Sequence, residues 1–308
     1  MGRENGVIYA LGFFDGVHKG HQAILQETKA LAARHGLRAG VFTYENHPQA
    51  VVGGGAPPLL TTAAERRQIF AAQGIEEIVM IPFDRAFAGQ SPEEFVQALV
   101  SQYNCAGLCC GENFHFGAQA AGDSRLLEQI CVRLGLVGRT APPVLEGGRT
   151  VSSTLIRTLL REGRPEEARV CLGRPFSLAG LVVHGDGRGR TMGLPTVNLQ
   201  PSDGALLPAV GVYASLAQLE DGRLLPGVTN VGLRPTFRTG GGPTVETNIL
   251  GFREDLYGRR IRLWLCRYLR GEQKFENSAL LIRQIAQDSQ KAQALLEQDD
   301  RGDIHDLF

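Results

Sequence analysis

Two histidines lie one helical turn apart near the amino terminus, with a glycine between them. His18, Gly20 and His21 end the run Gly-Phe-Phe-Asp-Gly-Val-His-Lys-Gly-His, which follows an apolar segment and opens an amphipathic one. The first strand-to-helix turn of a doubly wound sheet is where phosphates usually bind. Imidazole N–H groups there can donate hydrogen bonds to phosphate oxygens as negative charge builds up at an α-phosphorus. Taken alone, the pair is explained more simply as two surface histidines at a helix start.

The placement of positive charge favours a bound anion at this turn and at a second helix start. Lys19 is a cation where it opposes the helix dipole by roughly 0.3–1 kcal/mol. Further along, Ser153 or Thr154 could cap a helix, and a capping box starting at Thr154 would require Glu or Gln three residues later. That position holds Arg157 instead. We therefore expect a phosphate near Ser153, Thr154 and Arg157.

A glycine-rich loop and an extended segment carry candidate ligands in the second half of the chain. The loop over residues 185–193 contains Gly185, Gly187 and Arg190, and its backbone could wrap a polyphosphate, although many such loops only connect two strands. Thr196 and Asn198 lie two residues apart and therefore project from one face of an extended segment. Their neutral oxygens suit Mg²⁺ when phosphates supply the negative charge. A solvated strand face is the alternative interpretation.

One carboxylate lies in a later segment that alternates in the same way. Glu246 and Asn248 share one face of residues 244–250, while β-branched side chains occupy the other face. The alternation alone indicates only a carboxylate on a polar strand face. A catalytic role for Glu246 depends on the resemblance described below.

The elements that would position these residues fall into two groups. Strands alternate with helices from residue 7 to residue 170, which predicts a parallel, doubly wound α/β sheet. The predicted strands are Val7–Phe14, Leu37–Tyr44, Glu77–Phe83 and Ala106–Glu112, and the predicted helices are Gly20–His35, Thr62–Gln73 and Ser91–Tyr103. From Ser177 to Leu269, short alternating segments between glycine and proline clusters predict an all-β sandwich or barrel, and Ser278–Gln298 reads as a helix that packs on it.

Length and composition agree with a soluble protein of two domains. The chain has 308 residues, and its 32 basic residues balance 32 acidic ones, which argues against binding nucleic acid by bulk charge. No apolar run is long enough to span a membrane, and no secretory signal is evident. The six cysteines form no C-x-x-C pair, so we expect buried free thiols in a reducing compartment and a cytoplasmic location.

The motifs resemble those of the prokaryotic bifunctional riboflavin kinase/FAD synthetases. The His-x-Gly-His run, the His47-Pro48 step, the run Gly-Glu-Asn-Phe-His-Phe-Gly from residue 111 and the late Ser/Thr–Arg motif are similar to the FMN adenylyltransferase module, which belongs to the nucleotidylyltransferase superfamily. Gly-Leu-Pro-Thr-Val-Asn from residue 193, Gly-Val-Thr-Asn-Val-Gly-Leu-Arg-Pro-Thr-Phe from residue 227, Glu246 and Asp-Leu-Tyr-Gly from residue 255 occur in the order seen in riboflavin kinases. Together the two signatures cover about residues 7–292.

This resemblance implies a role for each candidate residue. The catalytic residues would be His18, His21, Arg157 and Glu246. ATP and its phosphates would be bound by Gly12, Phe13, Asp15, Gly20, Asn113, Ser153, Thr154, Gly185, Gly187 and Arg190. Thr196 and Asn198 would hold Mg²⁺, and Arg234 and Thr236 would contact the flavin.

The resemblance also implies the architecture and the reactions. A Rossmann-like adenylyltransferase domain would occupy residues 1–172, and a Greek-key riboflavin kinase barrel with a terminal helix would occupy residues 173–308. The protein would use ATP to convert riboflavin to FMN and then FMN to FAD, with no nucleic-acid or membrane partner and with a homo-oligomer allowed.

Two departures from the family pattern leave other functions open. Asn46 stands where proline is usual, and Gln119-Ala120-Ala121 lacks the usual basic residue. One alternative is therefore a riboflavin kinase with a degenerate adenylyltransferase domain. The other is a flavin-binding regulator without turnover.

Overall fold

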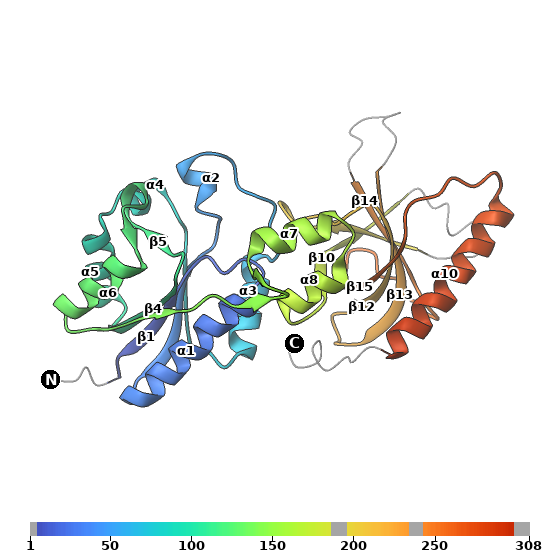
Figure 1. The fold of residues 1–308 in the computed structure, drawn as a ribbon. Helices are drawn as coiled ribbons and strands as arrows, with labels where there is room; N and C mark the ends of the chain where they lie inside the picture. Colours follow the sequence, from blue (N-terminus) through green and yellow to red (C-terminus); the bar gives the residue numbers. More distant parts are fainter. Residues whose placement is uncertain (1–4, 186–195, 234–242, 299–308) are drawn as a thin grey trace. The chain divides into compact units, whose positions relative to one another are not determined.

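The computed structural model describes residues 5–185, 196–233 and 243–298, and its chain forms two compact units (Figure 1). The first unit comprises residues 5–57 and 61–152, and the second comprises residues 58–60 together with the described residues between 153 and 298. Helices α7 (Ser153–Arg161) and α8 (Pro165–Leu172) are therefore grouped with the second unit, where α8 packs against two barrel strands. The compact units thus separate at residue 152, about twenty residues before the predicted domain boundary.

The first unit is built on a five-stranded parallel sheet. Its strand order is β3-β2-β1-β4-β7, so the chain reverses its direction of winding between β1 and β4. The strands are β1 (Val7–Leu11), β2 (Arg38–Tyr44), β3 (Glu77–Ile81), β4 (Cys105–Gly111) and β7 (Val137–Ala141). Ligands of open α/β sheets bind outside the carboxyl ends of the strands at such a reversal.

Helices cover both faces of this sheet because its central strand is apolar on both sides. Val7, Tyr9 and Leu11 pack with residues of α5 and α6, whereas Ile8 and Ala10 pack with residues of α1 and α3. The helices are α1 (Lys19–His35), α3 (Ala63–Ala72), α5 (Pro92–Gln102) and α6 (Ser124–Arg133). The predicted doubly wound sheet is confirmed.

Short elements complete the first unit. They are α2 (Gln49–Val52), α4 (Arg85–Ala88), β5 (His115–Phe116), the 3-10 turn η1 (Ala118–Ala120), β6 (Gly122–Asp123), β8 (Leu145–Glu146) and β9 (Arg149–Thr150). The hairpin of β8 and β9 is the last structure before the second unit.

The second unit is a closed six-stranded barrel, which confirms the predicted barrel and its terminal helix. Around the barrel the strands follow the order β10-β11-β14-β13-β12-β15. They are β10 (Phe176–Val183), β11 (Val197–Pro201), β12 (Gly211–Gln218), β13 (Leu224–Leu233), β14 (Pro243–Ile249) and β15 (Arg260–Arg270). The buried hydroxyls of Ser215, Thr229 and Thr247 form a hydrogen-bonded row across three of these strands.

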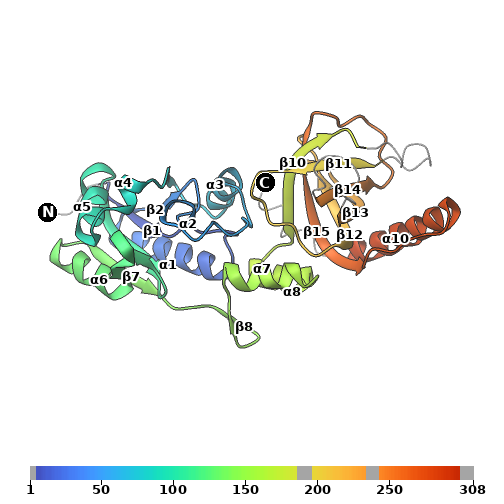
Figure 2. The ribbon, with the colours of Figure 1, turned by 90° about the horizontal axis from the view of Figure 1, so that it is seen from above.

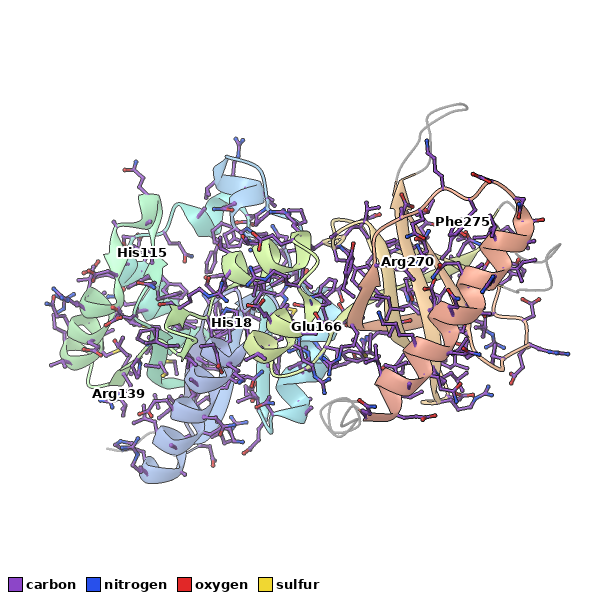
Figure 3. The ribbon with its side chains drawn as sticks, turned by 45° about the vertical axis from the view of Figure 1, so that its right-hand side comes forward. His18, His115, Arg139, Glu166, Arg270 and Phe275 are labelled. Atoms are coloured by element: carbon purple, nitrogen blue, oxygen red, sulfur yellow. The ribbon has the colours of Figure 1, made fainter. Side chains whose placement is uncertain are left out.

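Helix α10 (Ser278–Gln298) lies along the outside of the barrel against β12, β13 and β15 (Figure 2). An ion pair to the buried Asp288 holds it in place, because the Arg270 guanidinium donates to both Asp288 carboxylate oxygens at 2.8–3.2 Å. Arg270 also lies 5.9 Å from the centre of the Phe275 ring in the segment that leads to the helix (Figure 3).

Two further expectations can be compared with the described residues. All six cysteines are buried and free, and burial raises the pKa of Cys109 to about 11 and that of Cys110 to about 12. These thiols therefore stay protonated at neutral pH. Among the helices that the structure describes, none is both long and apolar enough to cross a lipid bilayer.

Candidate active sites

The turn after β1 has an unusual backbone. Phe14 has a φ of 59°, Gly16 of 80° and Val17 of 39°, so three of four consecutive residues lie in the left-handed region. For residues other than glycine this conformation costs on the order of 1–3 kcal/mol and persists only where surrounding contacts hold it. Such a turn, at the point where the sheet reverses its winding, marks a candidate active site.

Asp15 and Thr61 hold the middle of this turn. The Thr61 backbone N–H donates to Asp15 Oδ1 at 3.0 Å, and the Thr61 hydroxyl accepts from the Gly16 N–H at 2.8 Å. Asp15 is only 3% exposed. Its carboxylate therefore supports the turn from within, and its predicted contact with ATP stays a prediction.

The two histidines come together as predicted. Their rings stack with centroids 3.6 Å apart, and His18 caps α1 by accepting the His21 backbone N–H at its Nδ1 (3.4 Å). Burial, followed by the nearby His18 and Arg66, holds the pKa of His21 well below its usual value. His21 is therefore a neutral imidazole at pH 7. Its buried Nδ1 has no hydrogen-bond partner among the described residues.

Lys19 requires a correction. Its position at the helix start predicts a bound anion nearby. In the structure its Nζ donates to Glu146 Oε1 at 2.6 Å, in the β8–β9 hairpin. The carboxylate of Glu146 compensates the cation, so Lys19 is no evidence for a phosphate.

The neighbouring loops place the other predicted residues of the first unit. Asn113 is exposed in the turn after β4, where its carbonyl oxygen lies 3.1 Å from His115 Nδ1. Gly12 and Phe13 begin the turn after β1, and the centre of the Phe13 ring lies 4.3 Å from the Arg66 guanidinium and 4.6 Å from the centre of the His47 ring. Because β1 and β4 are adjacent, these loops lie at the same edge of the sheet.

The structure explains one of the two departures from the family pattern, Asn46, and not the other, at Gln119-Ala120-Ala121. Asn46 donates to Phe83 O at 2.9 Å and accepts from Phe83 N at 2.8 Å, which extends the pairing of β2 with β3 beyond the last strand residues. The Asn46 side chain therefore restrains the loop after β2 by hydrogen bonds, where the usual proline would restrain it through its ring. Gln119 and Ala120 both have a φ of 56°. Nothing in the structure explains why these two residues adopt it.

Ser153, Thr154 and Arg157 begin α7 and belong to the second compact unit. Arg157 is 7% exposed, and its Nε donates to the carbonyl oxygen of Pro58 at 2.8 Å. Its predicted contact with a phosphate stays a prediction.

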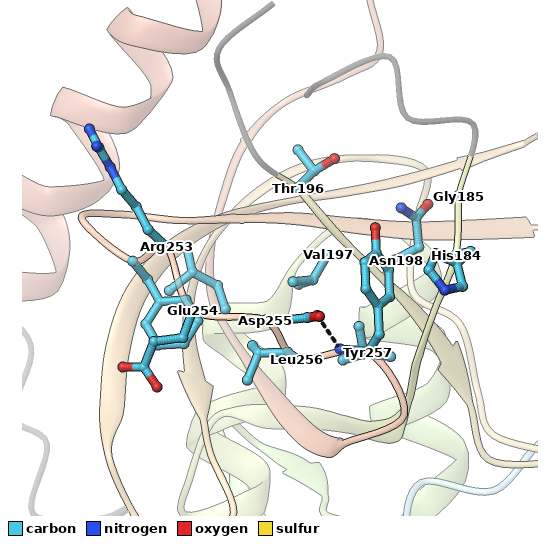
Figure 4. A pocket seen from close by; sticks show the side chains of 13 residues that line it. His184, Gly185, Thr196, Val197, Asn198, Arg253, Glu254, Asp255, Leu256 and Tyr257 are labelled. Atoms are coloured by element: carbon cyan, nitrogen blue, oxygen red, sulfur yellow. Dashed lines mark hydrogen bonds between the residues drawn. The ribbon is translucent and has the colours of Figure 1, made fainter. Parts of the chain in front are cut away.

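A second candidate site is a pocket of about 620 Å³ in the barrel unit (Figure 4). Thr196, Asn198 and Gly185 line it, together with the segment 252–257 that follows β14. The Asn198 side chain lies so close to Gly185 that an added Cβ there would be 2.2 Å from its Nδ2. A side chain larger than glycine at this position would displace the Asn198 amide from where it lies.

Glu246 lies directly beside Asn198 in the sheet. In the antiparallel pairing of β11 with β14, Asn198 is opposite Glu246, and Asn230 of β13 is opposite Glu246 on its other side. Opposite residues in such a ladder project from the same face with Cβ atoms about 4.5–5.5 Å apart. The barrel thus brings the predicted base and one predicted metal ligand together, although Glu246 is not among the residues described as lining the pocket.

Some residues of both sites were given no role by the sequence analysis, although Tyr257 lies within its Asp-Leu-Tyr-Gly motif. The rings of His184 and Tyr257 stack 3.8 Å apart in the pocket, and Arg253 and Glu254 line it. Arg66 lies fully buried beneath the first turn. A lone arginine in an amphipathic helix resembles a surface residue, so only its contacts single it out. The predicted residues Gly187, Arg190, Arg234 and Thr236 lie outside the described residues.

Side-chain oxygens beside a carboxylate in one unit, and stacked imidazoles at a strained helix start in the other, are groups that nucleotide-dependent transferases use. Comparison with known proteins agrees with this class. A family model described as FAD synthetase matches residues 2–155, and one described as riboflavin kinase matches residues 172–296. The chain belongs to the family of bifunctional riboflavin kinase/FMN adenylyltransferases.

Individual relatives cover nearly all of the chain. The bifunctional riboflavin kinase/FMN adenylyltransferase of Bacillus subtilis is 34% identical over 92% of this chain and 91% of its own, and that of Escherichia coli K12 is 35% identical with the same coverage. A crystal structure described as a macrolide-efflux protein from Streptococcus pneumoniae matches 94% of both chains with a TM-score of 0.85 and 29% identity. The likeness therefore extends over both units.

Proposed function

We propose that this protein phosphorylates riboflavin to FMN in the barrel unit and adenylylates FMN to FAD in the sheet unit, with one ATP consumed in each step. Both family models, and relatives that cover about nine-tenths of the chain, support this assignment over a riboflavin kinase with a degenerate adenylyltransferase domain. The observation that carries it is that each unit holds its own constellation: His18 with His21 in one, Asn198 with Glu246 in the other.

In the kinase step, Glu246 accepts the proton of the ribityl 5′-hydroxyl as its oxygen bonds to the γ-phosphorus of ATP and ADP leaves. The neighbouring oxygens of Thr196 and Asn198 suit Mg²⁺, because neutral ligands leave the negative charge to the phosphates. When bound, the ion would neutralise charge on the phosphate oxygens. Gly185 keeps the Asn198 amide in place by leaving it space.

In the adenylyl step, a phosphate oxygen of FMN bonds to the α-phosphorus of a second ATP, and pyrophosphate leaves. The neutral His21 contributes a hydrogen bond and not a full positive charge, because its pKa lies well below its usual value. The N-terminus of α1 adds backbone N–H groups and the helix dipole. Arg157 carries the matching family motif on α7, and its contact with a phosphate stays a prediction.

The cellular setting follows from the same chemistry. Six buried free thiols fit a reducing compartment, and we propose the cytoplasm. The proposed ligands are riboflavin, FMN and ATP; a homo-oligomer stays a prediction.

Product analysis with doubly labelled ATP tests the assignment. The purified protein is mixed with riboflavin, Mg²⁺ and ATP that carries one isotope at the α-phosphorus and another at the γ-phosphorus, and the flavins are separated. We expect FMN to carry only the γ label and FAD to carry one γ and one α label per molecule. Products that stop at FMN would indicate the kinase alone, and unchanged riboflavin would indicate a binding protein.

A further inference from the structure

A buried arginine lies directly under the strained turn of the first site. Arg66 of α3 has no exposed surface, and its Nη1 donates to the carbonyl oxygen of Phe13 at 2.7 Å and to the Thr43 hydroxyl at 3.2 Å. Its Nη2 donates to the carbonyl oxygen of Glu45 at 3.0 Å. One guanidinium therefore joins the turn after β1 to the end of β2.

Helix α3 and the residue Thr61 that precedes it hydrogen-bond to this turn at two points. Arg66 binds the carbonyl oxygen at its start, and Thr61, just before the helix, binds Asp15 and Gly16 in its middle. Between these two anchors lies Phe14 with its left-handed backbone. Without the anchors, the strained turn would relax toward an ordinary conformation and move the cap of α1 with it.

The arginine also brings a positive charge to the base of the site. Burial lowers the pKa of Arg66 to about 10, while Asp15 acts in the opposite direction. The group is therefore still protonated at pH 7. A buried cation is costly unless it is paired and hydrogen-bonded, and a polyanion bound at the turn above it would be attracted by it.

We propose that Arg66 is a positioning residue for adenylyl transfer: its guanidinium fixes the Phe13–His18 turn in the geometry that receives the nucleotide phosphates, and its charge supports their binding. The inference rests on the proposed function of the first unit. Arg66 does not touch substrate, since it is fully buried, and it acts through the turn.

The test compares three variants of the full chain. Arg66→Met removes the charge and the donors at similar volume, and Arg66→Lys keeps the charge but cannot span three acceptors. Arg67→Met is the matched control, because Arg67 is the exposed neighbour on the same helix. For each variant we measure kcat and KM for ATP in the conversion of FMN to FAD, the number of ATP-binding sites per chain, and riboflavin phosphorylation in the same preparation.

We expect Arg66→Met to lower kcat/KM for FAD formation about 100-fold per functional site, the loss associated with a misplacement near 1 Å. Arg66→Lys should keep the KM for ATP near that of the wild type while kcat falls. Riboflavin phosphorylation should stay within twofold in both. A purely structural role would reduce the number of binding sites and leave kcat and KM per site unchanged.

The inference would be overturned if kcat and KM for ATP, each expressed per functional site, differed by less than twofold between Arg66→Met and Arg67→Met. Should Arg66→Met fail to fold, Thr43→Val, which removes one acceptor, and Arg66→Lys decide the question by the same constants. A wild-type protein that makes no FAD from FMN would instead refute the proposed function of the unit.

Discussion

A methyl group added at Gly185 should disable the kinase site while leaving the fold intact. The added Cβ would lie 2.2 Å from Asn198 Nδ2 and 2.4 Å from its Cγ, whereas ordinary contact begins near 3.4 Å. The amide must therefore retreat by about 1.2 Å. A misplacement of that size can lower a rate about 100-fold. Because the obstructing atoms end a side chain that can swing away, the free energy of unfolding should change by less than about 1 kcal/mol.

The assay is riboflavin phosphorylation at saturating riboflavin, with ATP and Mg²⁺ varied, for Gly185→Ala and a control. Gly271→Ala serves as the control because its Cβ would meet nothing closer than the Tyr268 hydroxyl at 3.7 Å. We expect kcat/KM for ATP to fall about 100-fold in Gly185→Ala, with FAD formation from supplied FMN unchanged. A value within threefold of the control, in folded protein, would refute the placement of Asn198 in the site.

Two further predictions concern stability. Because the folded pKa of His21 lies below its unfolded value of about 6.5, the unfolded chain gains a proton first as the pH falls; the free energy of unfolding should drop below pH 6.5 by at most about 1.4 kcal/mol per pH unit. Denaturant titrations from pH 5 to 7.5 should show that the free energy of unfolding changes less steeply with pH in His21→Asn than in the wild type. The same pH dependence in both proteins would show that His21 is not the group responsible. Asp288→Ala leaves the Arg270 cation without its buried partner and should destabilise the barrel unit by about 3 kcal/mol in thermal or denaturant unfolding. The ion pair would not stabilise the barrel unit if Asp288→Ala lost no more free energy of unfolding than Glu297→Ala, a substitution at an exposed position of the same helix.

Most elements could be predicted from the sequence because periodicity and caps carry strong local signals. The expected helix Ser91–Tyr103 forms over Pro92–Gln102, with Ser91 as cap and Glu94 completing a capping box. The helix Ser278–Gln298 has the bounds predicted. The strand expected over Val7–Phe14 ends at Leu11, since the next residues form the strained turn. The edge strand Val137–Ala141 had no clear signal, because its Gly and Arg interrupt the apolar pattern.

The sites could be predicted only where local chemistry is informative. The stacking of His18 on His21 follows from their spacing on one helix start. The adjacency of Asn198 and Glu246 depends on strand register, which alternation within each segment does not determine. Lys19 was misinterpreted because its partner Glu146 is distant in sequence. Arg66 gave no signal for the same reason, since its acceptors lie on other elements.

The central claim is that two separate sites perform two separable reactions. In one set of preparations, the rates of FMN formation from riboflavin and of FAD formation from supplied FMN are measured for Glu246→Gln and His21→Ala. Glu220→Gln and His35→Ala, at exposed positions of the same units, are the controls. Glu246→Gln should lower FMN formation by about 10²–10⁴-fold, as for loss of a general base, and spare FAD formation, whereas His21→Ala should do the reverse. Equal loss of both activities in either folded variant would contradict the two-site account.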